Sequence, residues 1–68
     1  MKIIYDPDVD ALTVIFKDGP VEESDEEKEG FILDYDKKGN LVSIEVLDAS
    51  KRIKEPNSVT MELARKIA

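Results

Sequence analysis

The sequence lacks several of the residues on which common catalytic sites depend. It contains no cysteine and no histidine, so it has no thiolate or imidazole metal ligand and no cysteine nucleophile. Its serines have no histidine to activate them, and its three glycines stand apart at separate turns, so no glycine-rich phosphate loop is present. We therefore expect a protein that is not an enzyme and that binds no cofactor or metal.

Long hydrophobic runs are missing as well. No stretch approaches the roughly 18 consecutive apolar residues that a membrane-spanning helix needs. The apolar stretch within residues 1–6 is too short for a signal peptide. These features predict a cytoplasmic protein with no membrane partner.

The 68 residues that are present predict one compact domain. With 41% hydrophobic residues and only three prolines, the chain is too apolar for a disordered acidic tail and too poor in Gly and Pro for a linker. A chain of this length closes one hydrophobic core, so we expect a single domain over residues 1–68. Glutamate and lysine are abundant and glutamine is absent, a bias also reported for hyperthermophile proteins.

Charge is divided unevenly along the chain. The net charge is −6, but residues 1–47 contribute −8 and residues 48–68 contribute +2. An acidic protein is poorly suited to the phosphate backbone of nucleic acid, which we therefore do not expect as the main partner. In the alternative interpretation, nucleic-acid binding, the phosphate contacts are the bases of the C-terminal part: Lys51, Arg52, Lys54, Arg65 and Lys66.

Four segments have the composition of β-strands. Residues 2–5 and 11–16 are rich in β-branched and aromatic side chains, and the turn-favouring residues 6–10 separate them. Residues 31–35 and 41–47 flank a short loop with Gly39 and Asn40, which predicts a β-hairpin. Residues 21–30 predict either a polar edge strand or a solvated loop, and we favour an edge strand over part of them, which makes four to five strands in all.

The periodicity changes after residue 47. Asp48 is in position to cap a short helix over residues 49–53, which Pro56 would end. A second helix is predicted from Asn57 or Ser58 onward. It would carry an apolar stripe, formed by Val59, Leu63 and Ile67.

The same C-terminal residues leave a second interpretation open. Val59, Met61 and Leu63 also alternate with period two, so residues 58–63 remain compatible with a strand. We favour the helix. The fold class expected is α+β, an antiparallel β-meander of four to five short strands with a C-terminal amphipathic helix packed on one face.

Two sets of residues are candidates for partner binding. The first is an acidic run that could dock on a basic surface or merely protect an exposed edge, and it includes Glu22, Glu23, Asp25, Glu26 and Glu27. The second stands on the sheet face that one helix cannot cover: Ile15, Leu41 and Leu47. An exposed apolar face predicts either self-association or a protein partner, whereas singly scattered residues would leave a monomer.

Asp6, Asp8 and Asp10 have the spacing with which a calcium-binding loop begins. The rest of that motif is missing, because the chain has Ala11 and Lys17 where glycine and a bidentate carboxylate are needed. We expect these carboxylates to accept hydrogen bonds from backbone N–H groups of the turn instead.

Short motifs spread over most of the chain resemble those of a known family. They are Tyr5-Asp6-Pro7, Asp10-Ala11-Leu12, Asp34-Tyr35-Asp36 with Gly39-Asn40, and the run from Ile44 to Ser50. Together they resemble the small prokaryotic domain-of-unknown-function family 2283. The resemblance implies a β-rich α+β domain without assigned activity or catalytic residues, and it suggests an antitoxin-like or partner-binding role. A protein-binding module is therefore the function we expect, with nucleic-acid binding as the alternative.

Overall fold

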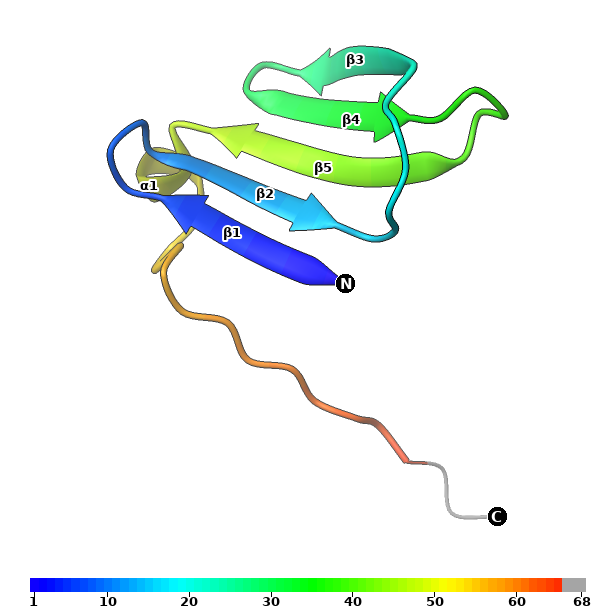
Figure 1. Cartoon of the computed structure of the whole chain (residues 1–68). Helices are drawn as coiled ribbons and strands as arrows, with labels where there is room; N and C mark the ends of the chain where they lie inside the picture. Colours follow the sequence, from blue (N-terminus) through cyan, green and yellow to red (C-terminus); the bar gives the residue numbers. More distant parts are fainter. Residues whose placement is uncertain (66–68) are drawn as a thin grey trace.

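A computed structural model describes residues 1–65, which form one five-stranded antiparallel sheet and one short helix (Figure 1). The elements in chain order are β1 (Lys2–Asp6), β2 (Ala11–Ile15), β3 (Glu23–Lys28), β4 (Phe31–Tyr35), β5 (Leu41–Leu47) and α1 (Ala49–Arg52). Within these residues, no helix is long and apolar enough to cross a membrane.

The hairpin predicted over residues 31–47 is confirmed, and β4 and β5 pair with one register shift between Asp34 and Tyr35. Asp36 organises the connecting loop, because its carboxylate accepts hydrogen bonds from the backbone N–H groups of Lys38 and Asn40 at 2.9 and 2.8 Å. The Lys17 ammonium donates to the same carboxylate at 2.6 Å. These contacts lower the pKa of Asp36 to about 2, with the hydrogen bond from Lys17 as the largest cause.

The strand order is β1-β2-β5-β4-β3, so the prediction of a simple meander was wrong. After β2 the chain crosses β5 and β4 to the far edge of the sheet before it forms β3 (Figure 1). In a meander β3 would lie in the middle of the sheet, where its four acidic residues would lose contact with water at a high cost. The mostly apolar β5 takes the central position instead.

Helix α1 covers part of one sheet face. Ala49 is fully buried and forms the core with Leu12 and Val46, while Phe31 and Ile53 pack against this cluster. The predicted cap at Asp48 was wrong, because the side chain of Asp48 makes no capping hydrogen bond.

The predicted C-terminal helix does not form in the described residues. After a turn at Glu55, residues 57–65 adopt neither helix nor strand, and all of them are exposed. Lys66 and Ile67, which belonged to that prediction, lie outside the described residues. A short helix is marginal in water unless it packs against the fold, and residues 57–65 leave the sheet instead (Figure 1).

The strand register defines two sheet faces. The helix face, on which α1 packs, is apolar and includes Ile3, Tyr5, Leu12, Val14, Phe31, Leu33, Ile44 and Val46. The opposite face, which we call the open face, is crossed by the connection between β2 and β3 (Figure 1). It is mixed and includes Ile4, Thr13, Ile15, Ile32, Asp34, Ser43, Glu45 and Leu47.

Candidate functional site

The turn between β1 and β2 is fastened to the start of α1 through Asp10. The Asp10 carboxylate accepts hydrogen bonds from the Ser50 backbone N–H at 2.9 Å, the Ser50 hydroxyl at 2.6 Å and the Tyr5 hydroxyl at 2.7 Å. The Asp10 carbonyl also accepts the Ala49 N–H at 2.9 Å. Asp10 therefore supplies the helix cap that we had assigned to Asp48.

This arrangement, which we call the Asp10 latch (Tyr5, Asp10 and Ser50), also shifts two pKa values. Hydrogen bonds from Ser50 and Tyr5 hold the pKa of Asp10 below its ordinary value. Donation to Asp10, followed by desolvation, raises the pKa of Tyr5. The latch thus stabilises a charged Asp10 and a neutral Tyr5.

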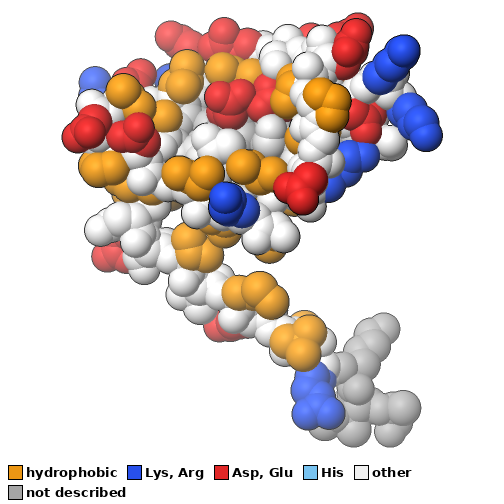
Figure 2. All heavy atoms as spheres, viewed as in Figure 1, with side chains coloured by type: hydrophobic (Ala, Val, Ile, Leu, Met, Phe, Trp, Pro, Cys, Tyr) orange, Lys and Arg blue, Asp and Glu red, His pale blue; other side chains and the backbone are white. Residues whose placement is uncertain are grey.

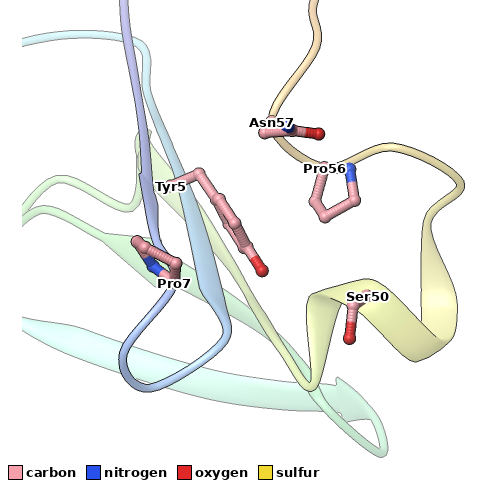
Figure 3. A pocket seen from close by; sticks show the side chains of 5 residues that line it. All are labelled: Tyr5, Pro7, Ser50, Pro56 and Asn57. Carbon is pink, nitrogen blue, oxygen red and sulfur yellow. The ribbon is translucent and has the colours of Figure 1, made fainter.

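An open cleft lies beside the latch, where Pro7 and Tyr5 face Pro56 and Asn57 (Figure 3). It has a volume of about 630 Å³, and Ser50 completes its lining. Two of its lining residues belong to the chain that follows α1, so the cleft marks where that chain leaves the folded body.

We call residues 57–65 the C-terminal segment. Val59, Met61 and Leu63 are 59%, 81% and 82% exposed, and their alternation puts them on one side of an extended chain. Figure 2 shows hydrophobic side chains along this segment as it extends from the sheet. The described residues provide no apolar surface that covers them.

A polar cluster occupies the middle of the open face. Asp34 is only 3% exposed, and its carboxylate accepts hydrogen bonds from the Ser24 and Ser43 hydroxyls at 2.6 and 2.7 Å. Burial opposes its ionisation, but hydrogen bonds from Glu45, Ser24 and Ser43 lower the pKa of Asp34. The carboxylate therefore stays charged in a site with little water.

The pKa of Glu45 is shifted in the opposite direction from that of Asp34. Its hydrogen bond to Asp34, together with desolvation and the like charge of Asp34, raises the pKa of Glu45. The two carboxyl groups thus tend to share one proton, with Glu45 as the donor.

We did not predict this cluster from the sequence. A usable signal was present, because Asp34 interrupts an apolar strand, and Ser43 and Glu45 alternate with apolar residues in the next one. A polar residue in the interior of a strand needs a partner, and the neighbouring strand is where to look for it.

The predicted apolar residues of the open face do not lie together. Leu41 and Leu47, 36% and 40% exposed, stand at opposite ends of β5, and Ile15 is partly buried on β2. Ser43 and Glu45 lie between the two leucines, so the three residues form no continuous apolar patch.

The acidic run lies where an edge strand was predicted. Every residue of β3 is exposed, and β3 forms the edge of the sheet. Acidic side chains gather over this edge (Figure 2). Glu22, Glu23, Asp25 and Glu27 face solvent, while the Glu26 carboxylate accepts the Gly30 N–H at 2.9 Å.

The basic residues of the C-terminal part differ in their contacts with the rest of the fold. The Arg52 guanidinium donates to the Leu47 carbonyl at 2.8 Å and lies 5.5 Å from the centre of the Phe31 ring. Lys51, Lys54 and Arg65 are exposed, and Lys66 lies outside the described residues.

The three aspartates of the first turn do not form a calcium-type loop. Asp6 accepts the Asp8 N–H at 2.9 Å, as predicted for the turn, whereas Asp10 accepts the Ser50 N–H of α1 instead of one from the turn. Within residues 1–65 no group of three carboxylates is arranged to hold a metal ion.

Fold and surface together define a small protein whose described residues form one antiparallel sheet and one four-residue helix. The family model described as "Protein of unknown function (DUF2283)" matches residues 2–50, and the chain belongs to this family. The matched range includes the whole sheet and the Asp10 latch, and it ends before the C-terminal segment. The search of curated proteins found no match, and the search of solved structures found none either.

Proposed function

We propose that this protein is a non-enzymatic protein-binding module whose C-terminal segment engages the partner. The observation that carries the proposal is the exposure of Val59, Met61 and Leu63, at 59%, 81% and 82%. Burying one such side chain stabilises a complex by about 1.5–3 kcal/mol, so the segment offers substantial binding free energy. An exposed apolar segment on a stable domain is typical of chains that become ordered on a partner.

The alternation of the segment favours a particular mode of binding. An extended peptide with apolar side chains on one side can add a strand to a partner's sheet edge, with its side chains in alternate pockets. The segment contains one acid and one base, Glu62 and Arg65, so charge does not oppose its insertion.

The acidic body of the protein would then select the partner. A net charge of −6, concentrated at the β3 edge, attracts a basic protein and raises the rate of encounter. A small basic protein held by the segment and steered by the sheet corresponds to the antitoxin-like form of this proposal.

The test compares two variants of equal charge. Met61→Glu/Leu63→Glu places charges on the apolar side of the segment, whereas Thr60→Glu/Ala64→Glu places the same charges on the other side. We expect the wild type and the Thr60/Ala64 variant to capture one stoichiometric protein from a lysate of the native host. The Met61/Leu63 variant should capture at least about tenfold less.

Titration of the purified partner by calorimetry then measures the affinity of each variant. Equal affinity of the two double variants would contradict a role of the segment. Recovery of no stoichiometric partner would contradict the proposal as a whole.

A further inference from the structure

The outer edge of β1 lacks the features that usually prevent another strand from pairing with a sheet edge. β1 pairs along its whole length with β2, and its other side is without a strand partner within residues 1–65. Ile3 and Ile4 are 38% and 45% exposed there, and the strand has no proline and no bulge. Edge strands normally carry a proline, a bulge or charges along their length, because free N–H and C=O groups can otherwise pair with another strand.

The sequence of β1 is complementary to itself when two copies run antiparallel. With Ile4 at the centre, each Ile4 lies opposite the other Ile4, and Ile3 lies opposite Tyr5. Lys2 then lies opposite Asp6 at both ends, so each end brings opposite charges together. A shift of the register by two residues would break both charge pairs.

We propose that β1 pairs antiparallel with β1 of a second copy of this chain, so that two sheets join into one. A two-fold axis through Ile4 closes this contact, which limits the assembly to a dimer. It also keeps the helix faces of the two copies on the same side, where Ile3 of one copy meets Tyr5 of the other. The argument for this contact uses β1 alone and does not depend on the proposed function; Pro56 and Asn57 face Tyr5 of the same chain across the neighbouring cleft.

Charge favours the β1 edge over the β3 edge for this contact. β1 has one lysine and one aspartate, so its net charge is zero, while β3 has four acids and one lysine. Two β3 edges would repel one another, and the sheet order places β3 at the greatest distance from β1. A single strand pair buries less than the roughly 1,600 Å² of a standard interface, so we expect a dimer that dissociates in the micromolar range.

Sedimentation equilibrium of the full chain from about 1 to about 300 µM tests the assembly. We expect a reversible monomer–dimer equilibrium that Lys2→Glu weakens at least about tenfold, because it places two acids together at each end. Lys28→Glu on β3 changes the net charge equally and should have little effect. Adding Asp6→Asn to Lys2→Glu should restore part of the affinity, because it removes one of the two acids at each end. The turn should be preserved, because asparagine keeps the acceptor for the Asp8 N–H.

Crosslinking tests the register. The chain has no cysteine, so Ile4→Cys and Ile3→Cys each introduce a single thiol of similar exposure. Opposite residues lie about 5 Å apart between Cβ atoms and diagonal ones about 7–8 Å, so Ile4→Cys should form an intermolecular disulfide much faster. Equal rates at the two positions, a strict monomer at about 300 µM, or equal effects of Lys2→Glu and Lys28→Glu would each overturn the proposal.

Discussion

β1 and β3 are the two edge strands of one sheet, yet they expose opposite kinds of side chain. β1 presents Ile3 and Ile4 between one lysine and one aspartate, whereas β3 presents four acids and one lysine. Within residues 1–65, both strands lack a strand partner along one side, so the difference lies in what their side chains permit. The acids of β3 oppose the approach of another strand, whereas the β1 edge carries no net charge.

The two edge hairpins also differ in how they are fastened to the rest of the fold. The β1–β2 turn is held by hydrogen bonds to Asp10 from the start of α1. The β3–β4 turn is held through Gly30, whose carbonyl accepts the Leu47 N–H at 2.8 Å and whose backbone lies against the Arg52 side chain. Helix α1, although it has only four residues, therefore contacts both edge hairpins at the same end of the sheet (Figure 1).

The largest effect is expected from a change at the β3–β4 turn. Gly30 has a φ of +83°, and an added Cβ would lie 2.5 Å from the Arg52 guanidinium. We expect Gly30→Ala to lower the free energy of unfolding by about 2 kcal/mol, because it strains the left-handed backbone and makes the flexible Arg52 side chain leave Leu47 and Phe31. Gly39→Ala is the matched control, because Gly39 has a φ of +85° with open space around it, and it should cost only about 1 kcal/mol.

Urea unfolding of both variants measures this difference. Equal losses would mean that the Arg52 contact contributes nothing to fastening the β3 edge, and that only the backbone conformation matters.

A second change should abolish the contrast between the edges. Glu23→Thr/Asp25→Thr/Glu27→Thr removes three negative charges from β3 and puts a β-branched residue at each position. We expect the variant to self-associate at least about tenfold more tightly than the wild type. The control, Glu22→Gln/Glu29→Gln/Glu55→Gln, removes the same charge outside β3 and puts no β-branched residue at Glu55, whose φ is +61°. If both variants associate equally in sedimentation experiments, net charge rather than the edge prevents assembly.

The smallest effect concerns the polar cluster of the open face. The pKa of Glu45 is raised above the ordinary 4.5, so its contribution to stability is complete below that pH and is lost as the pH rises through the raised value. Glu45→Gln keeps a hydrogen-bond donor for Asp34 but cannot ionise, so it should remove this loss. We expect a gain at neutral pH of less than about 1 kcal/mol, because Glu45 is partly exposed.

Lowering the pH into the acid range should reduce the stability of the fold. The pKa of Asp34 and that of Asp36 are lowered, the latter from 3.8 to about 2, so stability is lost as the pH falls through this range. Urea unfolding from about pH 2 to about pH 8 separates the two effects. A Glu45→Gln variant with the pH profile of the wild type would show that the carboxyl pair does not share a proton.

Local sequence patterns determined most of the strands of this protein. The hairpin of β4 and β5 has its predicted bounds, since alternating apolar residues and a Gly-Asn turn act over a few residues. The acidic run was predicted as an edge strand, because its charges exclude a central position. That prediction already conflicted with a meander, which would have put the run between β2 and β4.

Only the tertiary structure decided how these pieces are connected. Asp10 and Ser50 are 40 residues apart in the chain, so no local pattern could identify their contact. The polar residues within β4 and β5 indicated that Asp34 needs a partner on the neighbouring strand, but only the tertiary structure shows that its carboxyl group is paired with that of Glu45. The C-terminal residues are compatible with helix and strand alike, and they adopt neither because the described fold gives their apolar side chains nothing to pack against. Strand composition is a local property, whereas strand order, helix capping and carboxyl pairing depend on which distant segments bury one another.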